Sequence, residues 1–177
     1  MLYRLERLLK LDQNSDINSG FSLIELLVTI AILAILLSVA VPSFATYLDR
    51  SKVDTVSMNL KSDLVSARSE ASKTGFRTTL CASDDEQQCS GTFSQGWIVF
   101  RDTNGDGTVN NNESILKVSG RIEAGTTVKA LAGDDSSVTQ MVYNYRGFLN
   151  SELTVEVSRN NSSQILDLKK SGRVVLK

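Results

Sequence analysis

The distribution of hydrophobic residues changes at two points along the chain. From Leu26 to Leu48 there are 23 consecutive residues without a charged side chain. As a helix rising about 1.5 Å per residue, this run is about 34 Å long, enough to cross a hydrocarbon core of about 30 Å. Thirteen of its residues are Leu, Ile, Val or Phe, which together favour insertion by about 4–8 kcal/mol. The run predicts a transmembrane anchor, and the alternative is a core helix, which so small a domain could hardly surround.

The helical pattern continues beyond the anchor but becomes amphipathic. Apolar residues recur at three- and four-residue steps from Val53 to Ala71, with charged residues on the other faces. Gly75 is a typical residue just after a helix end. We therefore expect one helix over 21–74, with a transmembrane half over 21–48 and an amphipathic half over 49–74. Pro42 lacks a backbone N–H for the helical hydrogen bonds, so we expect a kink or a loosened turn there.

After Gly75 the pattern alternates with a period of two residues, as in half-buried β-strands. Gly, Asn, Asp and Ser separate the alternating stretches. We expect strands over 77–81, 96–100, 114–118, 126–130, 138–145, 153–157, 165–168 and 173–176. A long helix followed only by strands predicts an α+β fold, in which the helix packs on an antiparallel sheet formed by residues 75–177.

Composition excludes several kinds of chemistry. The 177 residues carry 19 Lys and Arg against 20 Asp and Glu, so no global charge draws the protein to a polyanion. The chain has no histidine, which excludes Ser–His–Asp and Cys–His nucleophile systems and histidine-ligated metals. It also has no glycine-rich phosphate loop and no evident carboxylate pair in a pocket. We predict that the protein is not an enzyme.

Glu25 is an unusual residue at the head of the apolar run. A carboxylate at that depth costs about 1–3 kcal/mol, which is less than the insertion gain. In one interpretation Glu25 lies at the membrane interface, near the positive end of the helix dipole. In the other, cleavage after Gly20 frees the amine of Phe21, which then pairs with Glu25 of the same subunit or of a neighbour in a filament. A conventional secretory signal is a further alternative, but this apolar run is too long for one.

The stretch Gly20-Phe21-Ser22-Leu23-Ile24-Glu25-Leu26-Leu27, followed by the apolar helix with Pro42, resembles the class III signal of type IV pilins and type II secretion pseudopilins. The resemblance implies a leader over 1–20, cleavage between Gly20 and Phe21 by prepilin peptidase, N-methylation of Phe21 and a role of Glu25 in assembly. It also implies a single-pass protein of the bacterial inner membrane with its C-terminal domain in the periplasm. The implied partners are other pilins or pseudopilins and the inner-membrane assembly platform.

Later stretches narrow the resemblance to the H-type pseudopilin and FimT-like minor pilin family. They are 67–71, 80–81, 96–100, 102–107, 113–116, 142–144 and 171–173, together with Gly147. The implied fold is the pilin fold. The implied function is that of a minor subunit near the tip of a type IV pilus or a type II secretion pseudopilus. The alternative is a DNA-binding minor pilin for uptake in natural transformation.

Cys81 and Cys89 are separated by seven residues, in a domain expected to lie in the periplasm, where thiols oxidise. We predict a structural disulfide, worth about 2.5 kcal/mol for so short a loop. A reactive or metal-binding pair is the alternative, but no basic residue or third ligand lies nearby in the sequence.

The stretch 102–113 has the spacing of a calcium loop. Oxygen donors at positions one, three, five, seven and twelve are provided by Asp102, Asn104, Asp106, Thr108 and Glu113, and Gly107 stands at position six. The flanking residues alternate like strands, however, whereas an EF-hand requires helices. The alternative is a hairpin without metal, in which Asn and Gly provide turn geometry. No other cofactor is expected.

Four cations lie among the last nine residues: Lys169, Lys170, Arg173 and Lys177. They can protect an edge strand from aggregation. The alternative follows from the FimT-like resemblance, in which a basic C-terminal segment binds DNA. Gly172-Arg173 matches that segment, although Val175 stands where a second arginine is expected.

Overall fold

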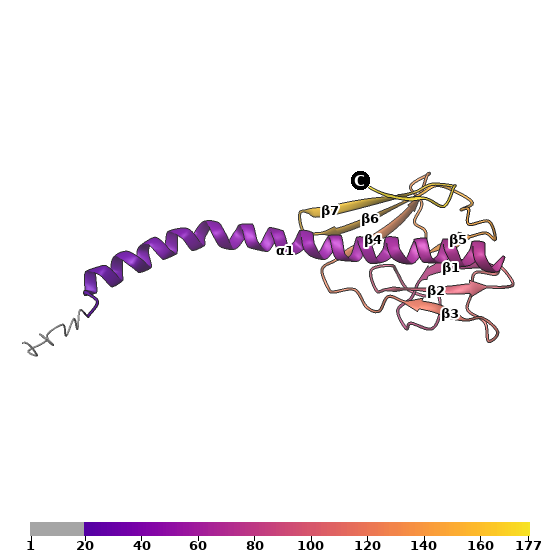
Figure 1. Cartoon of the computed structure of the whole chain (residues 1–177), viewed down its shortest axis with the longest axis horizontal. Coiled ribbons are helices and arrows are strands. Elements are labelled where there is room, and N and C mark those ends of the chain that lie inside the picture. The colour runs from indigo at the N-terminus through magenta and orange to yellow at the C-terminus, as the bar shows by residue number, and fades with distance from the viewer. Residues whose placement is uncertain (1–19) are drawn as a thin grey trace, which may run out of the picture. The chain divides into compact units, whose positions relative to one another are not determined.

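The computed structural model describes residues 20–177, so the predicted leader lies outside the described residues except for Gly20. One helix is followed by eight strands (Figure 1). The helix, α1, spans Leu23–Thr74 and ends immediately before Gly75, as predicted. The strands are β1 Arg77–Ala82, β2 Trp97–Asp102, β3 Ile115–Val118, β4 Thr127–Ala132, β5 Gln140–Tyr143, β6 Leu153–Arg159, β7 Ser162–Leu168 and β8 Val174–Leu176. All eight predicted strands are confirmed to within a few residues.

The described chain divides into two units, a first that ends at Val41 and a second, compact unit over residues 42–177. In the described part of the first unit, every side chain is exposed, and exposure continues to Leu48. This segment is long and apolar enough to cross a membrane. Pro42 stands inside α1 at the start of the second unit, and the expected kink there stays a prediction.

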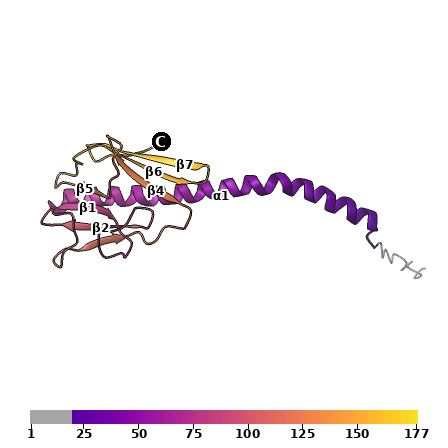
Figure 2. The same ribbon diagram turned by 180° about the vertical axis from the view of Figure 1, so that it is seen from behind.

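The strands of the second unit form two antiparallel sheets, whereas the sequence predicted one. The first sheet has the order β3-β2-β1-β5 and the second the order β4-β6-β7-β8 (Figure 2). The chain leaves the first sheet after β3 and returns to it at β5. Two residues before β5, the Val138 N–H donates to the carbonyl of Ala130 in β4 at 2.9 Å. Alternation within a strand identifies its buried face but does not specify which strands pair.

The main core joins α1 to both sheets. From α1 it takes Val53, Leu60, Leu64, Ala67 and Ala71, each at most 2% exposed. The two alanines near the end of the helix allow its backbone to approach the sheets closely. A smaller cluster of Cys81, Ile98 and Phe100 lies on the other face of the first sheet. Every core residue of the described chain lies between Val53 and Val174, so the second unit contains its own hydrophobic core.

Candidate functional site

The assembly residues predicted from the sequence lie at the start of α1. Phe21 is 77% exposed and Glu25 is in the first helical turn. The first backbone bond of the helix runs from the Leu26 N–H to the Ser22 carbonyl at 3.1 Å. The Phe21 amine that cleavage would free therefore belongs to a residue just before the helix, where a carboxylate in the first turn is also favoured by the helix dipole.

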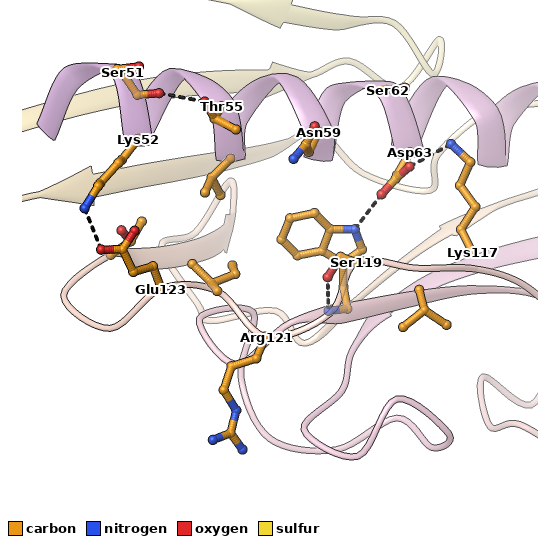
Figure 3. A pocket seen from close by; sticks show the side chains of 15 residues that line it. Ser51, Lys52, Thr55, Asn59, Ser62, Asp63, Lys117, Ser119, Arg121 and Glu123 are labelled. Carbon is orange, nitrogen blue, oxygen red and sulfur yellow. Dashed lines mark hydrogen bonds and ion pairs between the residues drawn. The ribbon is translucent and has the colours of Figure 1, made fainter. Parts of the chain in front are cut away.

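A groove of about 570 Å³ lies beside α1 in the second unit (Figure 3). One wall is the α1 face from Ser51 to Asp63, and the other is formed by Trp97 and the segment from Lys117 to Thr126. Val56, Val118 and Ile122 contribute apolar side chains to its lining, and small polar side chains such as Thr55 and Asn59 line the helix side. Figure 3 shows an ion pair near each end of the groove.

The first of these ion pairs involves Asp63, which also fixes the only tryptophan of the chain. The Trp97 Nε1–H donates to Asp63 Oδ2 at 2.9 Å, and Lys117 Nζ lies 2.8 Å from Asp63 Oδ1. Trp97 is 3% exposed, whereas the Asp63 side chain is 14% exposed. Asp63 therefore joins α1 to both β2 and β3, which the sequence analysis did not predict. The sequence signal that could have indicated this contact is the position of Asp63, a carboxylate next to the buried face of an amphipathic helix.

The second ion pair belongs to a charge network near residue 50 of α1. Lys52 Nζ lies 2.5 Å from Glu123 Oε1, and Arg159 Nε donates to Asp49 Oδ1 at 2.9 Å. The Asn160 amide donates to the other Asp49 oxygen at 2.7 Å. The pKa of Asp49 is lowered, chiefly by the Asn160 hydrogen bond and then by Arg159. The hydrogen bond from Lys52 lowers the pKa of Glu123. This network holds α1 to both the β3–β4 connection and the β6–β7 hairpin.

The predicted disulfide is confirmed. Cys81 and Cys89 are bonded, with Cα atoms 5.6 Å apart, and no free cysteine is present in the described chain. The bond closes the loop after β1, whose Asp85 carboxylate accepts hydrogen bonds from the Gln87 and Gln88 N–H groups at 2.8 Å each. These two bonds are also the main reason that the pKa of Asp85 is lowered.

The stretch proposed as a calcium loop joins β2 to β3, so strands flank it as predicted. One oxygen each of Asp102, Asp106 and Glu113 lies within 4.8 Å of the others. Asn104 and Thr108, in contrast, donate to Asp106 at 2.8 and 2.7 Å. Hydrogen bonds from Asn110 and Thr108 hold the pKa of Asp106 far below its usual range.

Asp102 stabilises this loop without a metal. It is 1% exposed and accepts hydrogen bonds from the Thr79 hydroxyl at 3.1 Å and from the Gly105 and Gly107 N–H groups at 2.6 and 3.1 Å. These hydrogen bonds are sufficient to explain the conformation of the loop. Calcium binding stays a prediction.

The four cations near the C-terminus do not form one basic tract. Lys169 pairs with Glu152 at 3.4 Å and Lys177 pairs with Asp167 at 2.5 Å. Lys170 and Arg173 are exposed and form no ion pair within residues 20–177. DNA binding by this segment therefore stays a prediction that rests on two free cations instead of four.

Comparisons with known proteins agree with this architecture. The family model described as Type II transport protein GspH matches residues 57–172, and that of the prokaryotic N-terminal methylation motif matches residues 17–41. The type IV major fimbrial protein FimA of Dichelobacter nodosus is 32% identical over 124 residues, which cover 68% of this chain and 67% of that protein.

Solved structures with the same fold include two minor subunits. The type IV minor pilin FimU of Pseudomonas aeruginosa has a TM-score of 0.54 at 19% identity, covering 74% of this chain and 92% of FimU. The minor pseudopilin EpsH of Vibrio cholerae has a TM-score of 0.53 at 10% identity, covering 72% of this chain and 94% of EpsH.

The apolar helix and the strand domain packed on its second half define the pilin fold, and the methylation motif at the head of the helix is that of the pilin and pseudopilin class. Within that class, the chain belongs to the GspH family of type II transport proteins. Its N-terminal methylation motif implies processing by prepilin peptidase.

Proposed function

We propose that the mature chain begins at an N-methylated Phe21, is held in the bacterial inner membrane by α1 and is assembled near the tip of a filament. The filament is either a type IV pilus or a type II secretion pseudopilus, and the second unit lies in the periplasm before assembly. No catalytic role is part of this proposal. The prepilin peptidase, other pilins or pseudopilins and the assembly platform are its partners.

The observation that carries the proposal is the exposure of every side chain from Phe21 to Leu48. A helix with this many exposed Leu, Ile and Val side chains requires either lipid or other apolar helices around it. A filament subunit is surrounded first by lipid and then by other apolar helices, because it leaves the bilayer to join a bundle of similar helices. The main core supports the same division, since it takes none of the residues from 20 to 52.

Glu25 provides the polar contact expected in that bundle. In lipid or among apolar helices an unpaired carboxylate is costly, so a neighbouring subunit that offers the Phe21 amine gains from pairing with it. The pairing fixes one axial position between subunits, which nonspecific apolar contacts do not provide.

The test is incorporation of full-length variants into sheared filaments in the host bacterium. We expect Glu25→Ala to accumulate in the membrane but to be lost from the filament fraction by at least tenfold. Asp54→Ala is the matched control, because Asp54 is an exposed carboxylate on the same helix. Normal incorporation of Glu25→Ala would contradict the proposal. A deletion strain scored for twitching, transformation and exoprotein release distinguishes a pilus from a secretion pseudopilus.

A further inference from the structure

Two turns and the end of α1 meet at one end of the second unit. The turn at 144–148 and the turn at 169–172 are joined by a hydrogen bond of 3.0 Å from the Leu149 N–H to the Lys170 carbonyl. Arg68 of α1 donates from Nε to the Gly147 carbonyl at 3.2 Å. Figures 1 and 2 both show β5, which leads into the first turn, beside the last turns of α1.

Exposed aromatic side chains gather at this place. Beyond residue 48, the exposed Phe and Tyr side chains of the described chain are Phe76, Tyr145 and Phe148, at 47%, 54% and 42% exposure. Thr78 pairs with Tyr143 in the β1–β5 register. A Cβ at Gly147 would lie 2.5 Å from Ser72 Oγ, near the end of α1. The turn at 144–148, which carries Tyr145 and Phe148, therefore lies beside the end of the helix, just before Phe76.

Three exposed cations lie on or next to the same two turns. Arg146, Lys170 and Arg173 are exposed and form no ion pair with any residue from 20 to 177. The Arg146 guanidinium lies over the Tyr145 ring, 5.3 Å from its centroid. We call the six residues Phe76, Tyr145, Arg146, Phe148, Lys170 and Arg173 the helix-end surface.

The composition of the helix-end surface is that of a protein interface. Aromatic residues and arginine are enriched at interface centres and dominate the binding energy there. Single-stranded nucleic acid would use open aromatic faces for stacking along a continuous basic track. Here Arg146 lies over the face of Tyr145, and Lys169 and Lys177 are neutralised by Glu152 and Asp167. Unpaired cations around apolar rings fit an acidic protein surface with apolar side chains among its carboxylates.

We propose that the helix-end surface docks an acidic surface of another, different subunit of the same filament. This inference rests on the proposed function, because it takes the partner from the assembled filament. Arg146 and Arg173 bind carboxylates of the partner, and Phe76 and Phe148 contact its apolar side chains. Contacts made here are separate from those of the apolar half of α1, so they give the subunit a specific neighbour.

The experiment places the photocrosslinking residue p-benzoylphenylalanine at Phe148 of the full-length chain in the host bacterium. The matched control places it at Ile165, an exposed apolar residue of β7. We expect a crosslinked product only from position 148, identified by mass spectrometry as another filament subunit joined through a peptide rich in Asp and Glu. Reversing charge with Arg146→Glu and Arg173→Glu together should lower its yield at least fivefold, whereas Lys129→Glu, at an exposed cation on β4, should not.

Several results would overturn the inference. They are a yield at position 148 no higher than at 165, a yield unaffected by the double charge reversal, a product between two copies of this chain, and a product sensitive to nuclease. The last of these would assign the surface to nucleic acid. The filament fraction is measured in the same cells. If the chain is present in filaments but gives no subunit crosslink, docking alone fails, and if it is absent from filaments, the proposed function fails with it.

Discussion

Replacing Asp63 tests how α1 is held to the first sheet. Asp63→Ala removes the acceptor of the Trp97 Nε1–H bond and the partner of Lys117. A hydrogen bond to a charged acceptor contributes about 1.5–3 kcal/mol. The pair with Lys117 adds about 0–1 kcal/mol, since the lysine side chain is 38% exposed. Because the groove is open, water can reach the orphaned donor, and we expect a net loss of about 2–3 kcal/mol in the free energy of unfolding.

The assay is urea unfolding of residues 42–177, which form one compact unit and contain every core residue. Trp97 is the only tryptophan, so its fluorescence reports on the groove as well as on global unfolding. Asp63→Asn keeps an acceptor for Trp97 and should lose about half as much as Asp63→Ala. Asp54→Ala, on the exposed face of α1, should change stability by less than about 0.5 kcal/mol. If Asp63→Ala is as stable as the Asp54 control, the assignment of Asp63 as the link between α1 and the sheet is wrong.

Four further predictions concern the second unit. Gly172 has φ +78°, and a Cβ there would overlap the Gly147 carbonyl oxygen. Gly172→Ala should therefore lower the free energy of unfolding in urea by about 2–4 kcal/mol, whereas Gly133→Ala, where a Cβ meets no atom, should change it little. Equal stability of the two variants would refute the close approach of Gly172 to Gly147. The hydrogen bond from Lys177 lowers the pKa of Asp167, so its stabilisation is present above about pH 4 and is lost as pH falls through the folded-state pKa. Burial raises the pKa of Tyr143, so stability should fall above about pH 10, where the unfolded phenol ionises and the folded one does not. A melting temperature that stays flat below pH 4 and above pH 10 would contradict both signs. If the β2–β3 loop binds calcium, millimolar calcium should raise the melting temperature, and Asp106→Asn should abolish this rise. An unchanged melting temperature up to several millimolar calcium would show that the loop does not bind the ion.

Much of the fold could be predicted because its signals are local. The uncharged run from Leu26 to Leu48, the apolar steps from Val53 to Ala71 and the stop at Gly75 determine the helix. Period-two alternation identifies all eight strands. The division into two sheets depends on which strands pair. It is set by distant pairings such as that of β1 with β5, in which Thr78 lies opposite Tyr143, and no local pattern specifies them.

The same limit applies to the candidate site. The disulfide could be predicted because the two cysteines are close in sequence and have no other partner. The ion pairs of Lys169 and Lys177 could not, because Glu152 is brought near by the folding of the sheet and Asp167 lies opposite β8. The helix-end surface was missed for a similar reason, since Phe76, Arg146 and Arg173 come from three separate segments.

We propose that a mature subunit starting at Phe21 enters the filament through its exposed apolar helix and Glu25. The most direct measurement is mass spectrometry of the N-terminal peptide of this protein, taken from sheared filaments. We expect a peptide that begins at Phe21 and carries one methyl group on its amine. Filament-incorporated protein that still carries residues 1–20 would contradict it.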